Sequence, residues 1–253
     1  MKQVILICFL LLFGSGVKGE TIVLGMSQDQ VAITATFDGS NILVFGAIKR
    51  EGKIPKVPLH IIVSISGPST PIVVRRKANT FGIWANKYKV TLDSAPSYYA
   101  VATSAPWNEV ISEQEDLQHK ISINSAISYA STQNDILNAD NFRDALIRIR
   151  TSQGLYQILE GDVAIDEQTL FRTSINMPAN LLEGNYRTRI FLTRDKKVIN
   201  HFETSIDVKK VGLERLLYRL SRENGLGYGL LSLAIAIFSG WLASSVFQYI
   251  RIR

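Results

Sequence analysis

A run of 26 residues without a charged side chain constrains this chain more than any other feature. The run, GLGYGLLSLAIAIFSGWLASSVFQYI, covers residues 225–250 and is followed by RIR at 251–253. A helix of this length is about 39 Å long, which exceeds the ~30 Å hydrocarbon core of a bilayer. We therefore predict one transmembrane helix at 225–250, with the lipid bilayer as its partner and a cytoplasmic tail at 251–253.

The first residues predict export. Lys2 precedes ten apolar residues, Val4 to Phe13, and small or polar residues follow up to Gly19. Ten apolar residues are too few to span a bilayer, so we predict a signal peptide at 1–19, with an uncleaved anchor as the alternative. The chain would then be a single-pass protein of the bacterial inner (plasma) membrane, with its bulk, 20–208, in the periplasm.

Three further observations bear on the location, the partners and the disulfide content of this chain. Five basic residues lie just before the span, and the positive-inside rule would place them in the cytoplasm, against the predicted orientation. The predicted export signal should still decide the orientation, because it commits the chain to translocation before the late span is synthesised. The whole chain has a formal charge of +6, whereas residues 20–208 carry 19 basic and 20 acidic residues. A near-neutral domain lacks the basic surface that nucleic acids require, so no nucleic-acid partner is expected. The single cysteine, Cys8, lies in the predicted signal peptide, so we expect no disulfide in the mature chain.

Residues 20–107 alternate apolar and polar side chains with the period of half-buried strands. The segments QVAITATF and NILVFGAI flank Asp38 and Gly39 and predict a hairpin. About seven short strands fit before Pro106, and strands return at 161–208. On one of them, Trp84, Tyr88 and Val90 are predicted to share a face. This density of strands predicts a mainly β fold, an immunoglobulin-like β-sandwich.

The pattern changes between these two strand regions, at 108–160, where helical spacing predicts amphipathic helices at about 113–130 and 139–151. We expect their apolar stripes to pack on the core rather than to form a ligand groove. The segment 209–224, KKVGLERLLYRLSREN, predicts a basic amphipathic juxtamembrane helix that lies on an anionic lipid surface. A polar N-terminal extension of the transmembrane helix is the alternative.

Three groups of residues are candidates for a structural or binding role. Tyr186 follows Leu182 and Gly184 at the spacing of a tyrosine corner, although an ordinary half-buried strand tyrosine fits as well. The sequence VVRRKANTFGIWANKYKV contains a candidate contact surface, which would otherwise be a solvated strand end: Arg75, Arg76, Lys77 and Trp84. Small residues recur along one face of the predicted span and form a candidate helix-packing face: Gly225, Gly229, Ser232, Ala236, Gly240 and Ser244.

No motif in the sequence indicates catalysis. His60, His119 and His201 lack metal-ligand spacing, and HExxH, CxxC, GxSxG and Walker-type loops are absent. The acidic cluster at 113–116 is interpreted as the start of a helix rather than as a metal site. We expect a noncatalytic protein without a cofactor, a metal or catalytic residues.

Several segments resemble a family of predicted single-pass transmembrane proteins of alphaproteobacteria whose function is unassigned. They include RRKANTFGIWANKYKV, PSYYAVATS, LFRTSINMPANLLEGNYRTRIFL and GWLASSVF. The resemblance implies a plasma-membrane protein with a periplasmic domain, associated with sulfite-exporter-like permeases. We therefore expect an interaction or accessory protein that works with a polytopic permease or with itself. The alternative is a periplasmic module that binds or senses a small anion through Arg75, Arg76 and Lys77.

Overall fold

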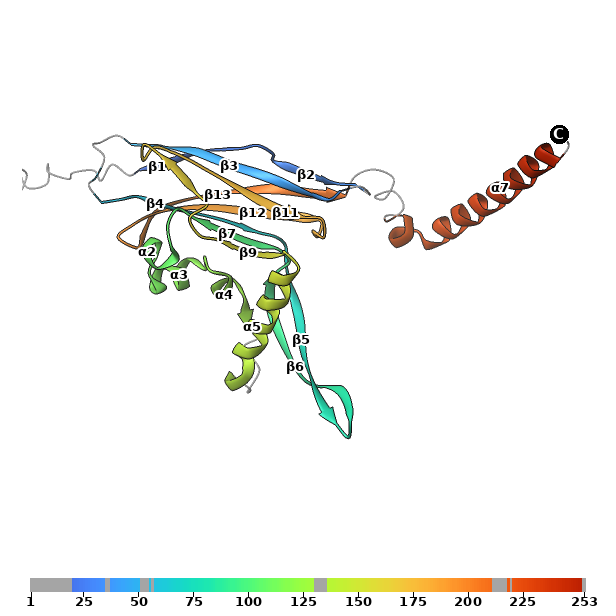
Figure 1. The fold of residues 1–253 in the computed structure, drawn as a ribbon, viewed down its shortest axis with the longest axis horizontal. Helices are drawn as coiled ribbons and strands as arrows, with labels where there is room; N and C mark the ends of the chain where they lie inside the picture. Colours follow the sequence, from blue (N-terminus) through green and yellow to red (C-terminus); the bar gives the residue numbers. More distant parts are fainter. Residues whose placement is uncertain are drawn as a thin grey trace, which may run out of the picture.

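The computed structural model describes residues 20–34, 37–50, 55, 57–129, 136–210, 218 and 220–251. The predicted signal peptide at 1–19 and residues 252–253 of the predicted tail lie outside the described residues. The division of the chain into sequence regions stays a prediction, whereas the sandwich and the C-terminal helix are observed (Figure 1).

Two sheets form the sandwich. The first sheet has the strand order β1-β3-β11-β10, and the second has the order β2-β13-β12-β4-β7-β9. The strands of the first sheet are β1 (Thr21–Met26), β3 (Gly39–Lys49), β11 (Leu170–Pro178) and β10 (Ala164–Asp166). Those of the second are β2 (Gln30–Ile33), β13 (Lys197–Lys210), β12 (Gly184–Arg194), β4 (His60–Ser66), β7 (Tyr99–Thr103) and β9 (Tyr156–Leu159).

The order of the strands is that of an immunoglobulin-like sandwich. In that fold one sheet holds strands A, B, E and D, and the other holds C, F and G. Here β1, β3, β11 and β10 correspond to the first set, and β4, β12 and β13 to the second. The predicted fold class is therefore confirmed.

The predicted hairpin around Asp38 and Gly39 is wrong. Strand β3 pairs with β1 and β11, while β2 pairs in parallel with β13 in the opposite sheet. The chain between β2 and β3 therefore passes from one sheet to the other. Alternation shows that a segment has a buried face, but it does not show which sheet that face belongs to.

The central strands of the second sheet are buried on both faces. Ile61, Ile62 and Val63 in β4 have no exposed surface, and every residue of β7 is buried. The first sheet covers one face, and the described part of the segment 107–152, residues 107–129 and 136–152, lies on the other (Figure 1). That segment contains α2 (Trp107–Val110), α3 (Glu113–His119), α4 (Ile123–Ala126), the short strand β8 (Ser128–Tyr129) and α5 (Ile136–Ser152).

The prediction of one continuous helix over about 113–130 is wrong. Helix α3 ends at His119, the next residue, Lys120, has a left-handed φ of 51°, and α4 begins at Ile123. The carboxylate of Asp116 accepts hydrogen bonds from the Ile121 and Ser122 amides, at 3.1 and 2.6 Å. Asp116 thus stabilises the break between α3 and α4, because its carboxylate binds two backbone amides that precede α4. The second predicted helix, at 139–151, corresponds to α5.

The phenol of Tyr186 is fully buried and donates a hydrogen bond to the Leu182 carbonyl, at 2.8 Å. Tyr186 lies near the start of β12, the strand that corresponds to strand F of an immunoglobulin-like sandwich. This is the contact that the predicted tyrosine corner requires.

The described residues contain one helix that is long and apolar enough to cross a membrane, at Gly225–Ser245 within α7 (Gly225–Arg251). The side chain of Asn224 accepts a hydrogen bond from the Gly227 amide, at 3.0 Å, so α7 starts with a capped end. The predicted helix over 209–224 is wrong at its start, because β13 continues through Lys209 and Lys210. Residues 211–217, which carry part of that prediction, lie outside the described residues.

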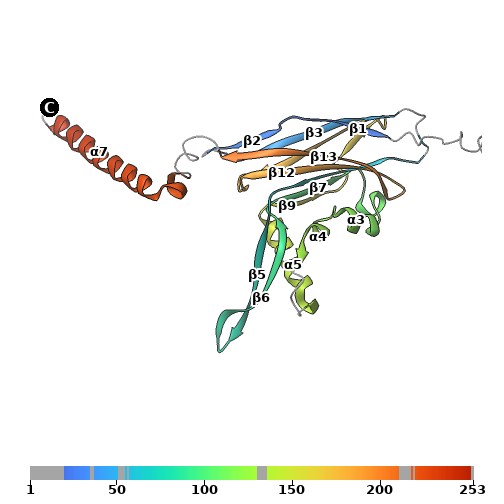
Figure 2. The ribbon, with the colours of Figure 1, turned by 180° about the vertical axis from the view of Figure 1, so that it is seen from behind.

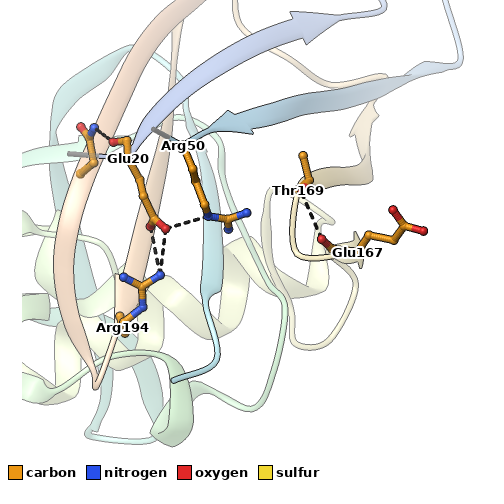
Figure 3. Close-up of polar contacts among 6 residues, drawn as sticks. Glu20, Arg50, Glu167, Thr169 and Arg194 are labelled. Atoms are coloured by element: carbon orange, nitrogen blue, oxygen red, sulfur yellow. Dashed lines mark hydrogen bonds and ion pairs between the residues drawn. The ribbon is translucent and has the colours of Figure 1, made fainter. Parts of the chain in front are cut away.

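A charged cluster joins strand ends that are far apart in the sequence (Figure 3). The Glu20 carboxylate, just before β1, accepts hydrogen bonds from Arg50 and Arg194, and the Glu20 carbonyl accepts one from Asn200. Nearby, the Thr169 hydroxyl donates to the Glu167 carbonyl in the turn before β11. Arg194 ends β12, so this cluster lies at the opposite end of that strand from Tyr186.

Candidate functional site

A long β-hairpin projects from the sandwich and carries the sequence VVRRKANTFGIWANKYKV. It consists of β5 (Ser69–Thr80) and β6 (Ile83–Pro96), which pair antiparallel. Apart from a short pairing of β6 with β8 near the base, it leaves the body of the molecule as a two-stranded arm (Figures 1 and 2). The basic triplet at 75–77 lies inside β5, because this strand continues to Thr80.

The tip of the hairpin is apolar and open to solvent. Phe81 is fully exposed, and the exposed fractions of Ile83 and Trp84 are 71% and 66%. Phe81 and Gly82 form the turn, and both have positive φ, 52° and 82°, as a type I′ hairpin turn requires. Asn79 accepts a hydrogen bond from the Gly82 amide, at 2.9 Å. We call Phe81, Gly82, Ile83 and Trp84 the apolar tip.

Phe81 is an unusual residue for this turn. A side chain with a Cβ is disfavoured at positive φ, and asparagine or glycine is preferred at both central positions of a type I′ turn. The conformation thus costs free energy, while the ring gains no packing because it is fully exposed. An exposed aromatic residue held in a strained turn is a feature to be explained by binding rather than by folding.

Arg76 is exposed, but its guanidinium lies close to two aromatic rings. Its guanidinium lies 4.6 Å from the centroid of the Tyr88 ring and 5.7 Å from that of Phe142 in α5. Phe142 is buried, so the cation sits between the hairpin and the helix that flanks its base. All four residues of the predicted contact surface, Arg75, Arg76, Lys77 and Trp84, are therefore exposed, and Arg76 also contacts the Tyr88 ring beside it.

The predicted common face of Trp84, Tyr88 and Val90 is wrong. Arg76 pairs with Tyr88, but Lys77 pairs with Asn86, so β6 contains one extra residue between them. Such a β-bulge inverts the alternation of the strand beyond it. Trp84 consequently lies on the opposite face of the hairpin from Tyr88.

The hairpin is strongly basic. Residues 69–92 contain no aspartate or glutamate and five cations, Arg75, Arg76, Lys77, Lys87 and Lys89. This charge contrasts with the near balance of residues 20–208 as a whole. The sequence therefore places a cationic arm on a domain that is otherwise acidic on balance.

The base of the hairpin lies at the end of the sandwich from which the chain leaves for α7. Pro68, just before β5, lies against Gly184, where a Cβ would come within 2.5 Å of the proline ring. Gly184 pairs with Val208, two residues before the end of β13. Figure 2 shows the same relationship, with the hairpin leaving the sandwich near the C-terminal end of β13.

The six small residues predicted as a packing face, Gly225 to Ser244, all lie on α7 and are exposed in the chain. A Cβ added at Gly225, Gly229 or Gly240 would meet nothing within 4 Å. The Ser232 hydroxyl donates a hydrogen bond to the Tyr228 carbonyl, at 2.9 Å, so its polar group is already satisfied within the helix. The surface is open to another helix, and the packing face stays a prediction.

A polar cleft of about 530 Å³ lies beside the base of the hairpin. Three cations, Lys120, Arg187 and Arg189, line it together with serine hydroxyls and the Tyr99 phenol, and no acidic residue is among its lining residues. The Arg187 Nε atom lies 3.3 Å from the Glu203 Oε1 atom, so the two side chains form an ion pair. Arg189 donates to the Tyr99 hydroxyl and to the carbonyls of His119 and Lys120. Its main role is to hold the break between α3 and α4.

The sequence did not point to Arg187 or Arg189 as site residues. It also did not point to Phe81 and Ile83, which are exposed beside Trp84 at the apolar tip. No local pattern connects Arg189 with Lys120, which are 69 residues apart. Folding also brings His119 within 6.3 Å of His201, ring centroid to centroid, with Phe191 beside both rings. Among the described residues, however, no group of three His, Cys, Asp or Glu side chains could hold a metal ion.

Comparison with known proteins supports the resemblance drawn from the sequence. A search of curated proteins found no match. One protein-family profile, described as "Putative transmembrane protein (Alph_Pro_TM)", matches residues 21–249, which include the whole sandwich, the hairpin and nearly all of α7. With so much of its length matched, the chain belongs to the Alph_Pro_TM family of transmembrane proteins.

Proposed function

We propose that the chain is a membrane-anchored interaction protein that acts in the periplasm as an accessory to a membrane transport complex. In this proposal α7 anchors the chain in the inner membrane, and the β5–β6 hairpin is its contact element. The observation that carries the proposal is the apolar tip, where Phe81, Ile83 and Trp84 are exposed at the end of a projecting arm. An exposed apolar cluster of this kind marks a binding surface.

The partner proposed within the membrane is a polytopic permease of the sulfite-exporter-like type. Two features support a helix-packing partner: α7 exposes small residues at intervals of three or four positions, and no side chain from Gly225 to Ile250 is charged. Small residues let helix backbones approach closely in lipid. The association with permeases is otherwise implied by the family resemblance.

The experiment is affinity capture of the full chain after membrane solubilisation, with a matched pair of substitutions in α7. Ala236 lies in the small-residue face and Ala234 lies two positions earlier, on the other side of the helix. Ala236→Leu should abolish recovery of a polytopic protein, whereas Ala234→Leu should leave it unchanged. Equal recovery with both variants would remove the proposed packing face, and repeated recovery of no partner would refute the accessory function.

Binding of a small anion is the second candidate, and the polar cleft beside the hairpin is the observation that favours it. The cleft gathers Lys120, Arg187 and Arg189 with hydroxyl groups, so it offers both charge and hydrogen-bond donors. The triplet at 75–77 does not line this cleft. In this proposal the anion would therefore bind at the cleft rather than at the triplet, and Arg187, whose side chain is exposed, would be one of its contacts.

This candidate is tested by thermal unfolding of the full chain in nanodiscs with sulfate, sulfite or phosphate added. Arg187→Gln should reduce any stabilisation by the anion. Arg172→Gln is the matched control, because Arg172 is an exposed strand arginine that is likewise close to one carboxylate, Asp166. Unchanged unfolding with every anion would exclude the cleft as an anion site.

A further inference from the structure

We propose that the apolar tip inserts into the surface of the bilayer in which α7 is anchored and that the hairpin cations bind anionic phospholipid headgroups. This inference rests on the proposed function, since it names the partner of the same hairpin. Here the apolar tip contacts lipid, and the proposed permease contacts the small-residue face of α7.

The residue types at the tip are those that favour a membrane interface. Tryptophan and phenylalanine place their rings at the boundary between headgroups and acyl chains, and an apolar element inserts roughly 5–10 Å there. The end of the hairpin exposes three large apolar side chains within four residues, those of Phe81, Ile83 and Trp84. A two-stranded tip is also narrow and convex, which suits insertion between lipids better than burial in a protein groove.

The cations lie at the depth that insertion of the tip would require. Thr80 and Ile83 form the last pair before the turn. Lys77 pairs with Asn86 three positions further from the turn, and Arg75 pairs with Lys89 two positions beyond that. At about 3.4 Å per residue, these positive charges are roughly 10–17 Å behind the tip. With the tip inserted, they would reach the level of the phosphates. Cationic side chains beside an inserted apolar group are the usual basis of attraction to anionic lipid.

The attachment of the hairpin favours the same membrane. Its base adjoins Gly184 and Val208, at the end of the sandwich where β13 leads toward α7. Only fourteen residues, 211–224, separate the last residue of β13 from the first residue of α7. The hairpin is therefore held at a high local concentration near the bilayer that contains α7, so even weak insertion would be populated.

Phe81 provides an independent argument. A turn that only had to reverse the chain would be better served by asparagine or glycine, because both tolerate positive φ. The ring of Phe81 has no packing role, since it is fully exposed. Insertion into lipid would bury this ring and account for its presence at the strained position.

The test uses the full chain in nanodiscs of phosphatidylcholine with or without phosphatidylglycerol. Cys8 is replaced by serine, and an environment-sensitive NBD fluorophore is attached at Ile83→Cys. The matched control is Ile158→Cys, an exposed isoleucine on the edge strand β9, whose exposed fraction is 60%. We expect NBD at position 83, and not at position 158, to shift to the blue and to be quenched by lipids with a quencher on the acyl chain.

The charge requirement is tested with Lys87→Gln combined with Lys89→Gln. Removing two surface cations should lower the ratio of inserted to free tip about thirtyfold in phosphatidylglycerol nanodiscs. Lys196→Gln combined with Lys197→Gln is the control, because both lysines are exposed and far from the hairpin, Lys196 in the turn before β13 and Lys197 at the first position of β13. An equal loss with the two double variants would overturn the proposed role of the hairpin cations.

A photoreactive residue at Trp84 in cells distinguishes the other outcomes. If position 83 shows no lipid contact and position 84 crosslinks to a protein, the lipid inference is wrong while the hairpin remains the contact element. If position 83 contacts no lipid and position 84 crosslinks to nothing, both the inference and the role of the hairpin in the proposed function fail.

Discussion

Arg194 donates two hydrogen bonds to the carboxylate of Glu20, at 3.0 and 3.1 Å, although 174 residues separate them. Arg50 donates a third, at 2.7 Å, and the Glu20 side chain is only 11% exposed. Burial by itself would raise the pKa of Glu20, but the hydrogen bonds and charges of Arg50 and Arg194 lower this pKa below its ordinary value of 4.5. One carboxylate thus joins the start of β1 to the ends of β3 and β12.

Glu20→Gln should destabilise the sandwich by about 2–4 kcal/mol at pH 7, because it leaves two largely buried guanidinium groups without this counter-charge. A lowered folded pKa contributes stability that is present above the unfolded value, near 4.5, and is lost as the pH falls through the folded pKa. The difference in the free energy of unfolding between the unaltered protein and the Glu20→Gln variant should therefore shrink at acid pH. Thermal unfolding of the full chain in detergent at several pH values measures it.

The control for this prediction is Glu203→Gln, which removes an exposed carboxylate 3.3 Å from Arg187. An exposed pair contributes only about 0–1 kcal/mol, so its loss should be small at every pH. A Glu20 variant that resembled the Glu203 variant would show that the three-residue cluster does not stabilise the fold.

Tyr186→Phe should lower the stability by about 1–2 kcal/mol while leaving the structure intact. The substitution keeps the buried ring and removes only the hydroxyl that donates to the Leu182 carbonyl, which then loses its partner. Tyr88→Phe is the control, since Tyr88 lies on the exposed hairpin and its ring contacts Arg76. Equal melting temperatures for the Tyr186 variant and the unaltered protein would contradict a structural role for this corner.

Gly46→Ala should destabilise the first sheet by about 1–3 kcal/mol. A Cβ at Gly46 would come within 2.6 Å of the Val23 carbonyl oxygen and 2.7 Å of the buried Phe171 ring, and neither can move freely. At Gly25 a Cβ would come equally close, at 2.6 Å, but only to the Phe45 ring, which is exposed and free to turn. Gly25→Ala should therefore cost less, and chemical denaturation of both variants compares them.

The parts of this molecule that could be predicted from the sequence are those fixed by local patterns. The 26-residue uncharged run gave α7, alternation gave the strands of the sandwich, and Leu182 and Tyr186 are only four residues apart. Each of these depends on the spacing of neighbours along the chain.

Features fixed by distant contacts could not be predicted. The parallel pairing of β2 with β13 depends on residues more than 170 positions apart, and Arg189 reaches Lys120 only after the fold has formed. The extra residue in β6 is also invisible in a pattern of period two, so the face of Trp84 was assigned wrongly. For the candidate site, the basic residues were visible in the sequence, but the exposure of the tip was not.

Phe81→Asn should separate stability from membrane contact. Asparagine tolerates the φ of 52° at this position, so the variant should be more stable by about 0.5–1 kcal/mol and melt a few degrees higher. Loss of the ring should at the same time reduce quenching of NBD at position 83 by lipid. Lys196→Asn, at a φ of 62° in the turn between β12 and β13, should not reduce this quenching. If Phe81→Asn lowered stability, or left the lipid contact unchanged, Phe81 would not be a strained residue retained for binding.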